Sequence, residues 1–192
     1  MILEGIVTTA NADGSPNVAP MGPIVDPAFR TLVLRPYQTS QTYANLKRHG
    51  RGVLHVTDDV ELLAQAAVNR LGNVPEMLSV PGVDGFIIAS ACRWYAFEVT
   101  HLDDREPRTH IEATVTASGR LRDFFGFNRA KHAVLEAAIL ATRLEFLPHD
   151  EVLAELERLR APVDKTAGPA ERRAFDFLVD YVRQAVGAAN HA

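Results

Sequence analysis

The sequence predicts an α+β protein, mainly antiparallel β, in which a β barrel or sheet is followed by a smaller helical region. Short β-rich runs separated by turn residues fill the first part of the chain, and helical periodicity fills the part after residue 128. Strands and helices do not alternate regularly, which argues against a doubly wound parallel sheet. We therefore expect two domains, a β domain at residues 1–122 and a helical domain at residues 123–192.

Three β-rich runs open the chain, at residues 2–9, 17–25 and 31–35. Asp13-Gly14, between the first two runs, predicts a tight turn. The second run contains Pro20 and Pro23, which lack the amide hydrogen that a strand donates to its neighbour. This run should therefore be an edge or bulged strand, with backbone groups free to contact a ligand.

A helix is expected at residues 38–50, where Thr39 or Ser40 can cap the start and Gly50 can close the end. After this helix we expect a strand at 52–57, a helix at 61–68 capped by Asp58 or Asp59, a loop at 71–84, and strands at 92–99 and 109–117. Three helices should follow, at 128–147, 151–160 and 170–188. Asp150 is expected to cap the helix at 151–160, and a linker at 161–169 should separate it from the helix at 170–188.

Composition narrows the class of protein. The chain has 192 residues, of which 47% are hydrophobic and 23% are charged, as in a soluble globular protein. A formal net charge of −4 argues against a nucleic-acid binder that relies on bulk positive charge. Cys92 is the single cysteine, which excludes an internal disulfide and a cysteine-based zinc site. No apolar run approaches the roughly 20 residues of a membrane span. We expect a cytoplasmic protein that binds neither nucleic acid nor a membrane.

Common catalytic motifs are absent from the sequence. It contains no Walker-type phosphate loop, no dinucleotide-binding glycine motif, no nucleophile elbow and no HExxH motif. The seven histidines are scattered and have no spacing that indicates a metal site. These absences argue against a hydrolase and a metalloenzyme, and we expect no metal centre.

A cluster of hydroxyl groups lies at the start of the helix expected at 38–50. Thr39, Ser40 and Thr42 follow Arg35, and Arg51 lies beyond the same helix. Free amide groups, hydroxyl donors and the helix dipole together favour an anion at such a position. A helix cap without a ligand explains the same residues, and local sequence favours it, because serine and threonine are common capping residues.

A charged stripe is expected on the helix at 128–147. Arg129, His132, Glu136 and Arg143 fall in a narrow arc that apolar residues flank on both sides. This pattern predicts that the stripe docks on the β domain, with Glu136 ionised and paired with at least one arginine. A structural ion network and a ligand-binding role both remain open.

Three segments resemble a known superfamily. Residues 6–22 (IVTTANADGSPNVAPMG) and 35–46 (RPYQTSQTYANL) resemble FMN-binding split-barrel proteins of the flavin-reductase-like type. Residues 128–144 (NRAKHAVLEAAILATRL) resemble the helical signature of an uncharacterised flavoprotein family, a domain-of-unknown-function family, that adds a small C-terminal helical domain to this barrel. The resemblance covers nearly the whole chain, from residue 1 to about residue 186.

The resemblance implies a six-stranded antiparallel split barrel, a homodimer, and FMN held noncovalently near the dimer interface. It implies that the hydroxyl-rich segment binds the FMN phosphate and that the second strand lies against the isoalloxazine ring. It implies no catalytic side chain, because the flavin itself performs the redox chemistry. A typical flavin reductase often has an asparagine in the fourth strand, where this chain has a histidine. The candidate cofactor-binding residues are Asn17, Ala19, Pro20, Met21, Gly22, Arg35, Thr39, Ser40, Thr42, Asn45, His55 and Arg129.

Three functions follow as hypotheses. The first is an FMN-dependent oxidoreductase that takes a hydride from a reduced nicotinamide or another donor, with the protein supplying orientation and exclusion of water. The second is a non-catalytic FMN-binding or carrier protein that acts through a partner. The third is a helix-capped barrel that binds another phosphate-bearing cofactor. The sequence separates the first two poorly.

Overall fold

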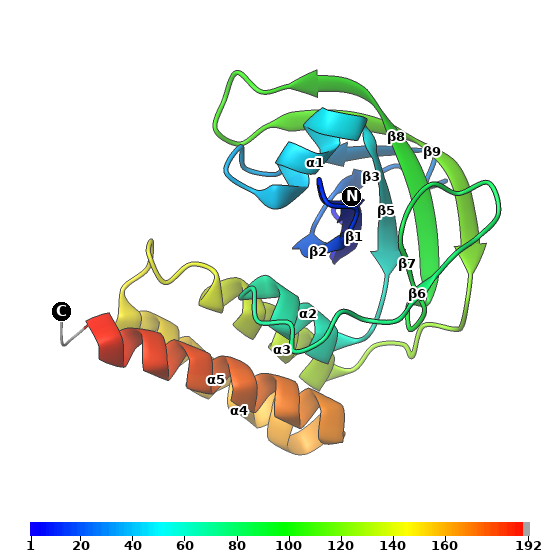
Figure 1. The fold of residues 1–192 in the computed structure, drawn as a ribbon. Helices are drawn as coiled ribbons and strands as arrows, with labels where there is room; N and C mark the ends of the chain where they lie inside the picture. Colours follow the sequence, from blue (N-terminus) through cyan, green and yellow to red (C-terminus); the bar gives the residue numbers. More distant parts are fainter. Residues whose placement is uncertain (190–192) are drawn as a thin grey trace. The chain divides into compact units, whose positions relative to one another are not determined.

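The structure, a computed structural model, describes residues 1–189 and divides into two compact units. The sheet unit consists of Met1–Asp58 and Asn73–Phe124. The helical unit consists of Asp59–Gly72 and the chain from Phe125 onward. Figure 1 shows the elements of both units.

The sheet unit is built on one seven-stranded antiparallel sheet with the strand order β2-β1-β5-β8-β9-β4-β3. The strands are β1 (Gly5–Ala10), β2 (Pro16–Met21), β3 (Ile24–Val25), β4 (Thr31–Leu34), β5 (Arg51–Val56), β8 (Arg93–Asp103) and β9 (His110–Arg120). Residues before β1 return to the other end of the sheet, where Ile2 bridges Ile24 and the amide of Val25 donates to the carbonyl of Met1. The sheet is therefore strongly curled (Figure 1). The expected α+β, mainly antiparallel class is confirmed, with seven strands in place of the six implied by the resemblance.

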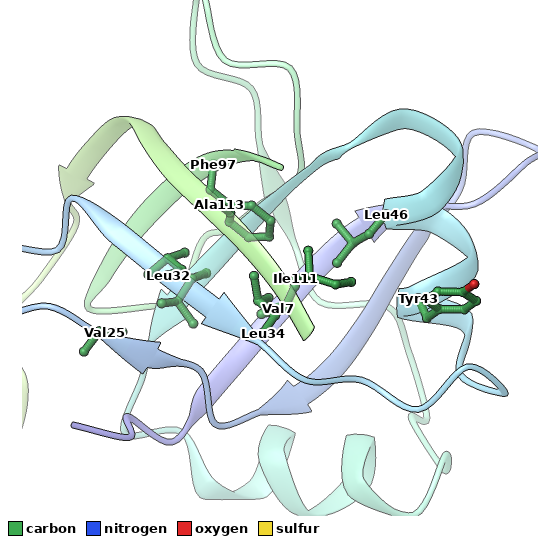
Figure 2. Packing of buried hydrophobic residues seen from close by; sticks show 10 residues of the cluster. Val7, Val25, Leu32, Leu34, Tyr43, Leu46, Phe97, Ile111 and Ala113 are labelled. Atoms are coloured by element: carbon green, nitrogen blue, oxygen red, sulfur yellow. The ribbon is translucent and has the colours of Figure 1, made fainter. Parts of the chain in front are cut away.

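The main core of the sheet unit lies inside the curl. Val7, Leu34, Leu54, Phe97 and Ile111 meet there, each from a different strand. Helix α1 (Gln41–His49) adds Tyr43 and Leu46 to the same cluster, as Figure 2 shows. Burial of these side chains fixes α1 against the sheet, because each large apolar side chain contributes about 1.5–3 kcal/mol when removed from water.

A second, smaller core lies on the opposite face of β5 and β8. It contains Val53, Ile87, Trp94 and Ala96. The hairpin of β6 (Met77–Leu78) and β7 (Ile87–Ile88) covers it. The loop expected at 71–84 is therefore wrong in part, because β6 lies within it. The prolines and glycines of this segment flank a two-residue strand, which is too short to show an alternation of apolar and polar residues.

The helix boundaries follow the capping residues closely. The hydroxyl of Ser40 accepts from the amide of Tyr43, and Gly50 closes α1 with a left-handed φ of 67°. Asp59 caps α2 (Val60–Ala67), and Asn128 caps α3 (Arg129–Ala141). These expected starts are confirmed, with Ser40 chosen over Thr39 and Asp59 over Asp58.

The helical unit corrects three expectations. Helix α3 ends at Ala141, and turns replace the helix expected to reach residue 147. Helix α4 (His149–Thr166) begins after Pro148 without a side-chain cap, and it continues through the predicted linker with Pro162 inside it. Helix α5 (Pro169–Ala189) then begins almost at once. Packing of Val163 into the unit offsets the hydrogen bond that a proline removes from a helix.

The charged stripe of α3 lies on the solvent side of the helical unit, so the expectation that it is buried is wrong. Arg129, His132, Glu136 and Arg143 are exposed. The buried side of α3 consists of Val134 and five alanines, namely Ala130, Ala133, Ala137, Ala138 and Ala141. Alanine lets helices approach closely. Because its apolar surface is small, the hydrophobic pattern of the sequence did not indicate this side of the helix as the buried one. None of the helices formed by residues 1–189 is long and apolar enough to cross a membrane.

Candidate functional site

The segment that leads into α1 is held firmly against the β8–β9 turn. The amide of Gln38 donates to the carbonyl of Pro107 at 2.9 Å, and its side-chain amide donates to the carbonyls of Asp104 and Glu106. The amide and hydroxyl of Thr109 both donate to the carbonyl of Pro36. Thr39 and Ser40 therefore follow a backbone whose position is set before any ligand arrives.

A second set of contacts fixes the body of α1. Lys47 Nζ donates to Asp104 Oδ2 at 2.7 Å and to the hydroxyl of Tyr43 at 3.0 Å, and that hydroxyl donates to Asp104 Oδ2 at 2.6 Å. The hydrogen bond from Lys47 holds the pKa of the Asp104 carboxyl below its usual value, and the same contact raises the pKa of Lys47. Asp104 therefore stays ionised at neutral pH, and Lys47 balances its charge.

A buried amide network joins α1 to β1 and β2. Asn17 Nδ2 donates to the hydroxyls of Thr9 and Thr42, both at 3.1 Å. Asn45 Nδ2 donates to the hydroxyl of Thr9 at 2.9 Å and to Asn11 Oδ1 at 3.0 Å. The network brings Asn17, a candidate from β2, next to Thr42 and Asn45, two candidates from α1. Thr42 and Asn45 are 2% and 0% exposed, so in this structure their side chains serve to position the two elements.

The groups that remain open to an anion are Thr39, Ser40 and Arg35. Thr39 is exposed, and Ser40 is half-buried at the helix cap. Arg35 is half-buried, and its Nε is a buried nitrogen without a hydrogen-bond partner among the described residues. Buried donors are rarely left unpaired, because an unmade hydrogen bond of this kind costs about 1–3 kcal/mol. A cationic donor without a partner in the segment before a hydroxyl-rich helix start fits a phosphate group.

Strand β2 forms one edge of the sheet. Within the described chain it pairs with β1 alone, from Gly5 opposite Met21 to Ala10 opposite Pro16. All six of its residues are half-buried. At the adjoining Gly22, an added Cβ would lie 2.8 Å from a carboxylate oxygen of Glu4, so a larger residue would require the flexible Glu4 side chain to move. The expected edge strand is therefore present, with Ala19, Pro20 and Met21 along its free side.

His55 lies elsewhere, between β1 and β7. It is 0% exposed, its Nδ1 lies 3.2 Å from the carbonyl of Ile6, and its Nε2 accepts from the amide of Ile88 at 3.1 Å. Burial lowers its pKa to about 4. Both ring nitrogens are used within the protein and no atom faces solvent, so the structure gives His55 a packing role in place of the cofactor contact expected from the sequence.

Arg129 belongs to the helical unit and is exposed on α3. Its role in cofactor binding stays a prediction. Within the described residues, no group of three or more His, Cys, Asp or Glu side chains could hold a metal ion.

Two family models cover most of the chain. Residues 3–122 match the N-terminal domain of DUF447, a family described as proteins of unknown function, and residues 128–180 match a second domain of the same family. The chain belongs to the DUF447 family.

Solved structures similar to this DUF447 chain include flavin proteins. An FMN-bound DUF447 protein from Methanosarcina mazei has a TM-score of 0.80 and 24% identity, with 94% of each chain covered. The styrene monooxygenase flavin reductase of Pseudomonas putida S12 has a TM-score of 0.50 and 14% identity over 61% of this chain and 78% of its own. An FMN-binding protein from Thermus thermophilus has the same TM-score and identity over 62% and 71%. The likeness shows the fold, a split barrel shared by the three proteins, with C-terminal helices shared with the protein from Methanosarcina mazei.

Sequence reasoning missed one feature of the sheet unit. A hollow of about 570 Å³ is lined by residues from β1, the end of α1, β5 and the segment before β7, among them Thr8, His49, Arg51, Asp84 and Phe86. None of the candidate cofactor residues lines it. Three separate stretches of the chain, 8–14, 49–52 and 79–86, form this hollow, so no local motif of the DUF447 sequence indicated it.

Proposed function

We propose that this protein binds FMN through the start of α1 and the free edge of β2, and that it acts as an oxidoreductase of the flavin-reductase-like type. The buried, unpaired Nε of Arg35 before the hydroxyl-rich start of α1 carries the proposal. The FMN-bound DUF447 protein from Methanosarcina mazei, with the same fold over 94% of this chain, supports the choice of cofactor.

Each group has a role in this proposal. Arg35 and the hydroxyls of Thr39 and Ser40 bind the phosphate, and the positive end of the helix dipole adds to the attraction. Asn17, Thr42 and Asn45 are positioning residues, because their hydrogen bonds hold β2 against α1. The backbone from Asn17 to Gly22 would contact the isoalloxazine ring. When bound, FMN supplies the capacity to accept and return a hydride or electrons.

The free edge of β2 also supports a homodimer with FMN near the interface. An edge strand leaves unpaired amide and carbonyl groups, to which a second chain can pair, and twofold dimers are the commonest protein oligomers. The electron donor in this proposal is a reduced nicotinamide or another small reductant.

The phosphate assignment predicts a strong preference for FMN over riboflavin, measured by quenching of flavin fluorescence. Arg35→Met should weaken FMN binding by about tenfold to a hundredfold, since a charge-assisted hydrogen bond contributes about 1.5–3 kcal/mol. Riboflavin affinity should stay unchanged in this variant. Arg30→Met, at an exposed arginine of the same unit, is the matched control and should bind FMN normally.

Equal affinity of the native protein for FMN and riboflavin would contradict the phosphate site. Tighter binding of another phosphate-bearing cofactor, such as pyridoxal phosphate, would support the third hypothesis in place of FMN.

Turnover is tested by mixing the FMN-loaded protein with NADH or NADPH in the absence of oxygen. In an oxidoreductase, the nicotinamide should reduce the flavin, so that its visible absorbance is lost and returns when air is admitted. The carrier hypothesis predicts that the bound flavin keeps its colour with both nicotinamides and that the holoprotein passes FMN to an apo-flavoprotein. This second outcome would overturn the enzymatic part of the proposal and leave FMN binding in place.

A further inference from the structure

The exposed side of α3 carries opposite charges that have no partner in the described chain. Arg129, His132 and Glu136, here called the α3 stripe, are all exposed. Neither Arg129 nor Glu136 forms an ion pair or a side-chain hydrogen bond within residues 1–189. The two residues lie seven positions apart, so they share one helix face about 10 Å from each other, which is too far for pairing within one chain.

An apolar groove lies beside the α3 stripe. It has a volume of about 490 Å³ and is lined by the stripe itself, Phe127, Ala133 and the α4 residues Leu159 and Pro162. Phe127 is 96% exposed, and its ring centre lies 6.0 Å from that of His132. A fully exposed phenylalanine next to an apolar groove marks a surface that gains free energy when it is covered.

The order of the charges determines what can cover this surface. In an antiparallel copy of α3, related by a twofold axis that passes between His132 and Ala133, Arg129 lies opposite Glu136 of the second copy, and Glu136 lies opposite Arg129 of the second copy. Two identical ion pairs then form on the exposed side of the helices, one on each side of the twofold axis. The stripe is therefore complementary to itself.

We propose that the α3 stripe and its groove form a self-association surface, on which a second copy of this chain docks with its own α3 antiparallel. Such a contact is isologous, so each favourable interaction occurs twice. The paired charges set the register, and the apolar groove with Phe127 supplies the buried surface. This inference concerns the helical unit alone and does not depend on flavin binding.

Charge reversal tests the proposal sharply. Arg129→Glu carries two acidic residues on the stripe, and Glu136→Arg carries two basic residues, so neither variant can pair with itself. In the full-length, FMN-loaded protein, each variant should raise the dissociation constant for self-association by about tenfold or more, measured by analytical ultracentrifugation. An equimolar mixture of the two variants should associate as tightly as the native protein, because every contact again joins opposite charges. The double variant should also recover self-association.

The control is Arg183→Glu, which makes the same charge change at an exposed position of α5 and should leave self-association unchanged. Circular dichroism of each variant confirms folding. Unchanged association of both single variants, or a mixture that associates no better than either variant alone, would overturn the proposal. Loss of FMN affinity in Arg129→Glu with normal self-association would overturn it too, and would support the cofactor-binding role predicted for Arg129.

Discussion

Replacement of Asn45 by alanine is expected to lower the free energy of unfolding by about 2–4 kcal/mol, since each buried polar group left without a partner costs about 1–3 kcal/mol. Asn45 is 0% exposed and donates to Thr9 and Asn11. Its carbonyl oxygen accepts from Gln41 and Arg48. The variant therefore leaves polar groups unpaired on β1 and α1 and also creates a small cavity.

The same change should weaken FMN binding, because the amide network positions the start of α1 against β2. Urea unfolding and a flavin titration on the same preparation measure the two effects. Asn73→Ala, at an exposed asparagine of the same unit, is the control, and it should change stability by less than about 0.5 kcal/mol. A loss below about 1 kcal/mol for Asn45→Ala would mean that water replaces the network readily, and the positioning role would then be wrong.

The stability of the sheet unit is expected to fall between pH 6.5 and pH 4 because of His55. Burial lowers its pKa to about 4 in the folded protein, whereas an exposed histidine has a pKa of about 6.5. In this window the unfolded chain binds a proton that the folded chain does not, so acid favours unfolding. The full difference is about 3 kcal/mol, of which about 2 kcal/mol is reached at pH 5. Stability from this group is complete above pH 6.5.

His55→Gln isolates this contribution, because the glutamine side chain offers an N–H donor group and a carbonyl acceptor but gains no proton in this pH range. Its free energy of unfolding should change between pH 7.5 and pH 5 by about 2 kcal/mol less than that of the native protein. The carboxyls with lowered pKa, such as Asp26 and Glu171, lose their contribution only at lower pH. The same pH dependence in both proteins would show that His55 titrates normally, and its assignment as a buried neutral group would be wrong.

Local signals predicted the elements of this fold well where a residue has one physical role. Ser40, Asp59 and Asn128 cap helices because their side chains accept from free amides, and Gly50 ends α1 because only glycine adopts a left-handed conformation freely. Predictions failed where packing overrode such signals. Pro162 lies inside α4, and the two-residue β6 lies within a predicted loop.

The candidate site shows the same division. The sequence indicated the edge strand β2 through its prolines and the hydroxyl-rich start of α1 through its capping residues. Contacts between distant segments determined which side chains remain available. Thr42 and Asn45 face Asn17 and Thr9 in a buried network, and His55 is enclosed between β1 and β7, whereas Arg35 keeps one donor unpaired.

By itself, the sequence determined most of the strands and helices, the caps of α1 and α2 and the resemblance to flavin proteins, because periodicity, prolines and capping side chains act over a few residues. Only the tertiary structure decided which face of α3 is buried. The sequence pattern placed Glu136 on an apolar face, yet five alanines and Val134 form the buried side. The physical reason is that burial of a helix face depends on how closely the neighbouring helices approach it. The fit of α3 to α4 and α5 arises only in the folded unit, so the hydrophobic periodicity of α3 alone does not predict it.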